Sequence, residues 1–196
     1  ISCPGCYPTS ILLPLFPLFK KNLIKLNNII IDSKSGYSGA GRGVHKKYKD
    51  KNLYESLSAY GVGFHRHNSE IDQMLRKFTK KKFQFSFTPH LSPMFRGILS
   101  TIYVDLENNI SQTKVLKTLI SFYKNESFVK ILKSGTLLST NEVINTNNCY
   151  ISVCKSKYSN KIIILSAIDN LIKGGAGQAV QNLNNKFNFS EKTGLK

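Results

Sequence analysis

Two apolar runs separated by a short polar stretch restrict the fold more than any other feature of this sequence. The first run is NNCYISVCKS (147–156) and the second is NKIIILSAI (160–168). Both contain β-branched residues, which are enriched in strands. With a short turn near Ser159 and Asn160, they predict a hairpin. The chain is therefore expected to contain a sheet that is at least partly antiparallel.

Further strand and helix patterns precede and follow this hairpin. Strands are expected at 27–36, 82–88 and 96–106, and helices at 8–24, 65–78, 111–125 and 174–187. Ser69 and Asp72 have the spacing of a capping box at the start of the second helix. The last helix carries an apolar stripe that we expect to be buried, formed by Ala176, Ala179, Val180, Leu183 and Phe187. These patterns predict one α+β domain over residues 1–196, with a mixed or mostly antiparallel sheet and flanking helices.

The chain is strongly basic, with 28 Lys and Arg against 11 Asp and Glu and a formal net charge of +17. Such a charge first suggests a nucleic acid or an acidic lipid surface as a partner. The lysines are spread over the whole chain, however, and their densest runs, at 46–51 and 80–82, fall in expected loops. No run of arginines and no aromatic–basic repeat occurs in the sequence. We therefore expect no nucleic-acid partner.

The remaining composition predicts a cytoplasmic protein without a membrane segment. Four cysteines in 196 residues do not make a disulfide framework, which favours a reducing compartment. The apolar stretch ILLPLFPLF (11–19) contains two prolines and is too short to span a bilayer. Because the chain does not begin with Met, we expect a further segment upstream of it in the parent protein.

The motif Cys3-Pro4-Gly5-Cys6 raises three possibilities, which are a redox pair, half of a metal site, or one reactive thiol. A structural zinc site needs a second pair of ligands. Cys149 and Cys154 are five residues apart on an expected strand and would face opposite sides, so we expect no metal. Cys6 follows a glycine and precedes an expected helix, whose N-terminus favours a thiolate. We therefore interpret Cys6 as a single reactive thiol.

A nucleophilic cysteine needs an acid–base partner, which is usually histidine. The densest group of histidines is in GFHRHNSEI (63–71). If this segment is extended, His65 and His67 face the same side, with Glu70 nearby. Acid–base catalysis, anion binding, a metal and a structural role all remain open for this group.

Two glycine-rich stretches invite a nucleotide-binding interpretation. The first is IIIDSKSGYSGAGRGV (29–44) and the second is KGGAGQA (173–179), which opens a helix after a strand. Neither has the G-x-G-x-x-G spacing of a dinucleotide-binding fold. We expect both to be backbone that comes close to an anion or a cofactor.

Several longer motifs resemble one enzyme family. They are PGCYPT (4–9), SGAGR (38–42), HRHNSEI (65–71), FTPHLSPMFRGILSTIY (87–103), IDNLIKGGAGQAVQN (168–182) and SEKTGL (190–195). In this order they resemble the N-acetyl-gamma-glutamyl-phosphate reductases of arginine biosynthesis, over nearly the whole chain. The resemblance implies the catalytic and dimerisation domain shared with glyceraldehyde-phosphate and aspartate-semialdehyde dehydrogenases. It also implies that an N-terminal NADP-binding domain is absent here, and that this chain alone is inactive.

The resemblance implies a reaction and a set of site residues. NADPH would reduce N-acetyl-gamma-glutamyl phosphate to the semialdehyde through a thioester on Cys6, in a homodimer or homotetramer. His65, oriented by Glu70, would move the proton. Candidate phosphate and substrate ligands are Ser38, Arg42, Arg66, His67 and Arg96. Candidate cofactor contacts are Gly175, Ala176 and Gln178. The alternative is a non-catalytic dimerisation or basic binding module derived from a truncated reductase.

Overall fold

The computed structural model describes residues 1–40, 55–158 and 160–196. Its centre is one seven-stranded sheet with the order β2-β3-β1-β4-β7-β6-β5. The strands are β1 (Ile29–Gly36), β2 (Ser58–Ala59), β3 (Phe85–Ser92), β4 (Ile98–Asp105), β5 (Val129–Ile131), β6 (Cys149–Lys155) and β7 (Lys161–Ile168). The pairs β1–β3 and β5–β6 are parallel, and the other neighbours are antiparallel. The expected mixed sheet is therefore confirmed.

The predicted hairpin is present as β6 and β7, which pair antiparallel from Cys149 opposite Ile168 to Lys155 opposite Ile162. Ser159, part of the predicted turn, lies outside the described residues. The central strands β1, β4 and β7 are rich in isoleucine, and alternate residues of each are buried. This alternation means that one face of the sheet forms the main core.

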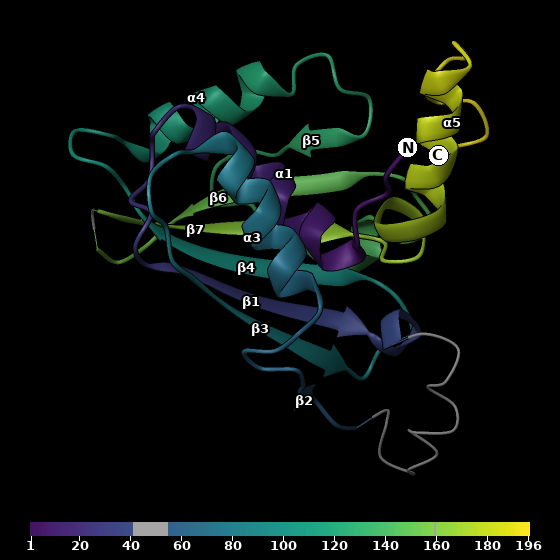
Figure 1. Cartoon of the computed structure of the whole chain (residues 1–196), viewed down its shortest axis with the longest axis horizontal. Coiled ribbons are helices and arrows are strands. Elements are labelled where there is room, and N and C mark those ends of the chain that lie inside the picture. Colours follow the sequence, from purple (N-terminus) through teal and green to yellow (C-terminus); the bar gives the residue numbers. More distant parts are fainter. Residues whose placement is uncertain (41–54, 159) are drawn as a thin grey trace.

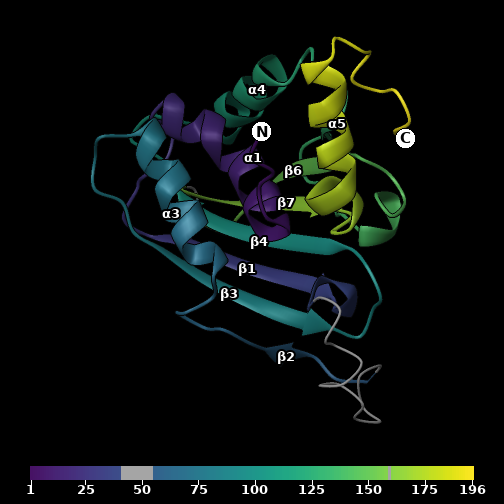
Figure 2. The same cartoon turned by 45° about the vertical axis from the view of Figure 1, so that its right-hand side comes forward.

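Helices cover that face of the sheet (Figure 1). They are α1 (Cys6–Lys20), α3 (His67–Phe78) and α4 (Gln112–Phe122), while α5 (Gly177–Lys186) lies to one side near both chain ends (Figure 2). Helix α1 packs against α3, α4 and β4. It is well suited to this central place because Ile11, Leu15 and Leu18 are fully buried at helical spacing.

The ends of two helices test the expected caps. Ser111 caps α4 as its sequence suggests, because its side chain accepts a hydrogen bond from Lys114 N. The predicted capping box at Ser69 is wrong, because α3 begins at His67 and Ser69 Oγ donates to the carbonyl of Arg66. The helix begins earlier where His67 is buried against neighbouring residues, so tertiary packing overrides the local cap signal.

The predicted buried stripe of α5 is also wrong for this chain. Val180, Leu183 and Phe187 are 39%, 51% and 64% exposed, and Ala176 and Ala179 are exposed too. The buried face of α5 is instead polar. Asn184 Nδ2, which is buried, donates to the carbonyls of Glu191 and Thr193. The C-terminal tail therefore occupies the inner side of the helix, and the apolar stripe points outward.

The second face of the sheet is only partly covered. The segment 132–143 packs Leu138 and Val143 onto Ala167 at one end of it. Farther along, Ile30 is 45% exposed and lies opposite Tyr103, which is 41% exposed. Tyr103 in turn lies opposite Ile163 on the next strand. An apolar row therefore crosses three strands on the face away from the helices.

Candidate active site

Cys6 is the first residue of α1, two residues before the helix start expected from the sequence. Gly5 is the N-cap, and its carbonyl accepts hydrogen bonds from both N and Oγ1 of Thr9, at 2.9 Å each. All four cysteines are free thiols, with Cys3 exposed and Cys6 half-buried. The structure therefore places a thiol at a helix N-terminus and forms no Cys3–Cys6 bond.

The backbone of Gly174 lies against Cys6. A Cβ atom built on Gly174 would stand 2.6 Å from Cys6 Cβ, closer than real Cβ contacts. Gly174 belongs to a π-helical turn (Ile172–Ala176) that leads into α5. Only a glycine can occupy this position without displacing the thiol residue. The sequence analysis did not single out Gly174, although it stands in the glycine-rich motif.

The start of α3 holds the residue before the thiol. The N–H of Gly5 donates to Glu70 Oε1 at 3.0 Å. A Cβ atom on Gly5 would stand 2.5 Å from His67 Nε2. Glu70 therefore holds the loop that leads to Cys6. The role expected from the resemblance was different, namely that Glu70 orients His65.

His65 and His67 lie together, with ring centroids 4.8 Å apart. They do not share an extended segment as expected, because His67 is already helical. His65 Nδ1 instead accepts a hydrogen bond from the backbone N–H of His67 at 3.1 Å. Both rings also contact Tyr7 edge-on, with centroids at 5.5 and 5.9 Å. The pair therefore lies beside the first turn of α1.

Burial shifts the pKa values of the thiol and of both imidazoles. The pKa of Cys6 is raised by burial, against the opposing effects of the N–H groups at the helix start and of Arg66. The pKa of His65 is lowered by burial and then by Arg66. Burial, His65 and Arg66 lower the pKa of His67 to about 4. Both histidines are therefore neutral near pH 7, and the thiolate expected from the helix N-terminus alone is opposed by burial.

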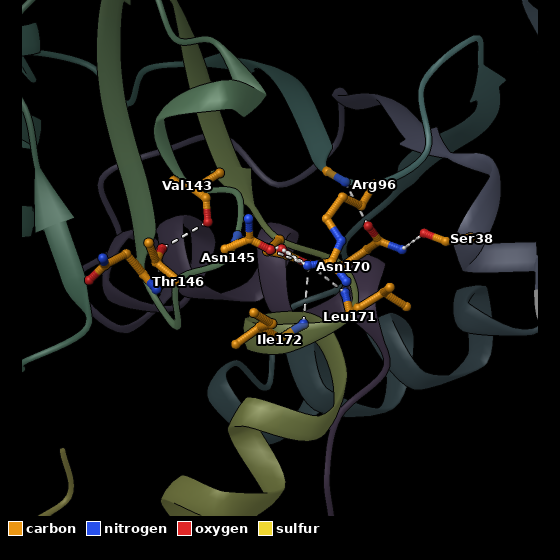
Figure 3. Close-up of polar contacts among 11 residues, drawn as sticks. Ser38, Arg96, Val143, Asn145, Thr146, Asn170, Leu171 and Ile172 are labelled. Atoms are coloured by element: carbon orange, nitrogen blue, oxygen red, sulfur yellow. Dashed lines mark hydrogen bonds and ion pairs between the residues drawn. The ribbon is translucent and has the colours of Figure 1, made fainter. Parts of the chain in front are cut away.

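A buried polar network fixes the turn that contacts Cys6 (Figure 3). Asp169, which is fully buried, accepts hydrogen bonds from Leu171 N and Ile172 N through Oδ1. Its Oδ2 accepts from Asn145 N at 2.8 Å and from Arg96 Nη1 at 3.2 Å. This carboxylate therefore caps the π-helical turn and joins it to two loops.

Asn170 extends the same network. Its Oδ1 accepts from Gly97 N at 2.7 Å, and its Nδ2 donates to Ser38 Oγ at 3.0 Å. Asp169 and Asn170 are not among the site residues predicted from the sequence. An Asp-Asn pair directly before a glycine-rich helix start is a signal that could have found them.

The structure brings only some of the predicted ligands close to the thiol. Arg66 is exposed at the start of α3, and its charge lowers the pKa of Cys6. Ser38 and Arg96 are engaged in the network around Asp169 and Asn170. Arg42 lies outside the described residues.

The predicted cofactor contacts follow Gly174. A Cβ atom on Gly175 would have only Asn170 O near it, at 3.4 Å, so this backbone is not covered by side chains. Ala176 is exposed, and Gln178 Nε2 donates to Thr9 Oγ1 at 3.3 Å in the first turn of α1. A cofactor contact at Gly175, Ala176 and Gln178 stays a prediction.

Two features are absent from the described part of the chain, a metal site and a membrane-spanning helix. No three His, Cys, Asp or Glu side chains in residues 1–40, 55–158 and 160–196 are grouped to hold a metal ion. Within the same ranges, no helix is both long and apolar enough to cross a membrane.

The chain is similar to known proteins over most or all of its length. Residues 6–170 match the profile of the family described as semialdehyde dehydrogenase, dimerisation domain. Over its whole length the chain is 46% identical to an N-acetyl-gamma-glutamyl-phosphate reductase from Halothermothrix orenii, covering 57% of that relative. It is 49% identical to a probable chloroplastic N-acetyl-gamma-glutamyl-phosphate reductase from Arabidopsis thaliana, covering 49% of it. The chain thus spans about half the length of these relatives.

The fold is also similar to solved structures. A probable aspartate-semialdehyde dehydrogenase from Pseudomonas aeruginosa superposes with a TM-score of 0.73 at 14% identity, covering 95% of this chain and 62% of that one. Aspartate semialdehyde dehydrogenase II from Vibrio cholerae gives 0.70 at 15% identity, again covering 95% and 62%. The expected fold and the expected resemblance are therefore confirmed. The chain belongs to the semialdehyde dehydrogenase dimerisation-domain family, and along its whole length it resembles the N-acetyl-gamma-glutamyl-phosphate reductases.

Proposed function

We propose that this chain is the thiol-bearing and substrate-binding part of an N-acetyl-gamma-glutamyl-phosphate reductase. The reaction would convert N-acetyl-gamma-glutamyl phosphate and NADPH into N-acetylglutamate 5-semialdehyde, phosphate and NADP. The names of the similar proteins support this proposal. The observation that carries it is the position of Cys6 at the start of α1, with the backbone of Gly174 against it and the histidine pair beside its neighbours Gly5 and Tyr7.

The thiol would form and later break one covalent bond to the substrate. Cys6 Sγ attacks the acyl carbon, the bond from this carbon to the phosphate oxygen breaks, and phosphate leaves with its electron pair. The product on Cys6 is a thioester. NADPH, when bound, would supply a hydride. Hydride addition at the acyl carbon would leave a thiohemiacetal oxyanion. Its electron pair would re-form the carbonyl as the C–S bond breaks, so that the thiolate and the aldehyde separate.

His65 is the proposed proton carrier. In the neutral ring its Nδ1 accepts the N–H of His67 and its proton is on Nε2, which would donate a hydrogen bond to a substrate oxygen. The ring would release a proton to that oxygen only from its cationic form. His67 is the competitor, since its Nε2 lies directly beside Gly5 and its buried Nδ1 has no hydrogen-bond partner within residues 1–40, 55–158 and 160–196. Glu70 would contribute by holding the loop before Cys6 in place.

Cationic groups would hold the phosphate and the substrate carboxylate. Arg66 is the strongest candidate, because it is exposed and its charge acts on Cys6 and on both histidines. Arg96 has a buried carboxylate partner in Asp169, so we propose that it mainly positions the turn at Gly174. For Arg42 and Ser38, a role in binding phosphate or substrate is proposed from the resemblance alone.

Gly175, Ala176 and Gln178 would contact the nicotinamide. The chain lacks a dinucleotide fingerprint, so we propose that a further domain, of the kind the greater length of the relatives allows, binds the pyrophosphate. The outward apolar stripe of α5 is a suitable surface for packing against such a domain. This chain alone would then neither bind NADPH tightly nor turn over.

The family description names dimerisation, which supports a homo-oligomer. We propose that a second copy covers the apolar row of Ile30, Tyr103 and Ile163 on the open face of the sheet. Paired open sheet faces bury apolar surface as in a sheet-on-sheet core.

An assay of a fusion enzyme tests the proposal. In it this chain follows the preceding domain of a longer relative, such as the Staphylococcus aureus reductase, which is 45% identical over the matched part. We expect NADP-dependent, phosphate-requiring oxidation of N-acetylglutamate semialdehyde. Cys6→Ser should abolish it and Cys154→Ser should not. His65→Asn should lower kcat by about a hundredfold or more, with unchanged circular dichroism.

The alternative is a non-catalytic dimerisation or basic binding module. It predicts a folded dimer whose fusion enzyme stays inactive even with Cys6 and His65 intact. An active fusion that is indifferent to Cys6→Ser would instead contradict the thiol mechanism.

A further inference from the structure

A basic cavity of about 690 Å³ lies between the C-terminal end of α1 and helix α4. Its lining residues are Lys20, Lys21, Leu23, Lys114, Lys117, Thr118, Ser121 and Phe122. We call it the four-lysine pocket. Helix α4 packs beside α1 (Figures 1 and 2). Because α1 rises about 1.5 Å per residue, Lys20 is about 20 Å from Cys6 along the helix. The four-lysine pocket is therefore separate from the candidate active site.

Two segments far apart in sequence form this pocket. Lys114, Lys117, Thr118 and Ser121 stand at i, i+3, i+4 and i+7 of α4, which places them on one face of the helix. Lys20 is the last residue of α1, and Lys21 follows it. The fold thus gathers lysines that look evenly dispersed in the sequence.

The four ammonium groups have no acidic partner in the part of the chain that the structure describes. The lysines that do form ion pairs there are Lys34 and Lys161, both on the sheet. The first turn of α4 contains no acidic residue. Four like charges around one hollow repel one another, and this repulsion is relieved when an anion enters.

Aromatic rings hold one of the lysines in place. Lys20 Nζ lies 5.6 Å from the ring centroid of Phe16 and 5.8 Å from that of Phe122. These distances are within the range of cation–π contacts. A lysine that is already oriented loses less freedom when it binds a ligand, which favours a defined site over a diffuse charged surface.

We propose that the four-lysine pocket binds a small polyphosphate anion, such as inorganic tripolyphosphate or the triphosphate group of a nucleotide. Lysine binds phosphate as a point charge, and four of them match a group with several phosphate charges. The four lysines line one hollow, which favours a compact ligand over a long nucleic acid. This site does not depend on the proposed function of Cys6.

Calorimetry of the full chain with inorganic tripolyphosphate tests the proposal. We expect one saturable site per chain. The double variant Lys114→Gln/Lys117→Gln should weaken binding by about tenfold or more, because two charge-assisted contacts are lost. The matched control is Lys80→Gln/Lys81→Gln, which removes the same charge from exposed residues elsewhere and should bind like the wild type. Lys20→Gln is the second pocket variant if the double variant does not fold.

Further ligands separate the sources of the phosphate groups. If adenosine triphosphate competes with tripolyphosphate, the site accepts a nucleotide. If adenosine triphosphate does not compete, the site is restricted to free polyphosphate. Either result supports the proposal. Equal weakening by the pocket and control variants would show diffuse charge and overturn it. Absence of saturable binding, or tighter binding of a single-stranded oligonucleotide that ignores both variants, would also overturn it.

Discussion

At the scale of single residues, the thiol and its neighbours are held by close backbone contacts more than by charge. The backbone of Gly174 contacts Cys6, and Glu70 accepts a hydrogen bond from the N–H of Gly5, the residue before it. Burial raises its pKa, so selective alkylation should favour the exposed Cys3. A substrate that reacts specifically is therefore a better probe of Cys6 than a general thiol reagent.

His67 should make the stability of the chain depend on pH. Its pKa is about 4 in the folded state, below the ordinary value of 6.5. As pH falls below 6.5, His67 binds a proton in the unfolded chain but stays neutral in the folded chain. The stabilisation is therefore complete above about pH 6.5 and is lost progressively toward pH 4, by at most about 3 kcal/mol.

Urea unfolding at pH 7.5 and pH 5 measures this effect. His67→Asn removes the titrating group and should flatten the difference between the two pH values. A variant that loses as much stability as the wild type over this range would show that other groups cause the pH dependence.

At the scale of elements, the Arg96–Asp169 pair fixes the π-helical turn before α5. Asp169 is fully buried, so Arg96→Met would leave its charge without a cationic partner and should lower the free energy of unfolding by about 2–4 kcal/mol. Arg76→Met is the matched control, since Arg76 pairs with Asp72 on the exposed face of α3 and should matter little. Chemical unfolding compares the two. Equal losses would mean that burial of Asp169 does not govern the turn.

Some of these elements could be predicted from local sequence patterns, and others could not. The β6–β7 hairpin, the Ser111 cap and the presence of a helix next to Cys6 depend on local patterns, and all three predictions are correct, although α1 begins two residues earlier and ends four residues earlier than expected. The start of α3 and the orientation of α5 depend on contacts with distant segments, and both predictions failed. An apolar stripe indicates that one face of a helix packs against another surface, but it does not indicate which surface that is.

The neighbours of Cys6 at the candidate site could not be predicted from the sequence, because they come from distant segments of the chain. Gly174 touches Cys6 across 168 positions of sequence, and Glu70 binds the backbone of Gly5 from α3. Residue type and spacing identified Cys6 and the histidine pair, but the partners of each side chain follow from the packing of α1 between α3 and the turn before α5.

At the scale of the whole molecule, the open face of the sheet should form the dimer interface. Ile30 lies opposite Tyr103 there, and both are exposed. Ile30→Lys should convert a dimer into a monomer, because a buried unpaired charge is costly. Ile120→Lys on α4, on the opposite side of the sheet, is the control, since Ile120 is similarly exposed at 48%. Light scattering after size exclusion measures both, and a dimer that survives Ile30→Lys would place the interface elsewhere.

The central claim is that Cys6 takes the acyl group from the substrate. Peptide mass spectrometry of the fusion enzyme, mixed with N-acetyl-gamma-glutamyl phosphate in the absence of NADPH, tests it most directly. We predict an N-acetylglutamyl group on the peptide that contains Cys6, with release of one phosphate per modified chain. The adduct should persist in Cys3→Ser and disappear in Cys6→Ser. An acyl group on Cys3, Cys149 or Cys154, or turnover by Cys6→Ser without any adduct, would contradict the account.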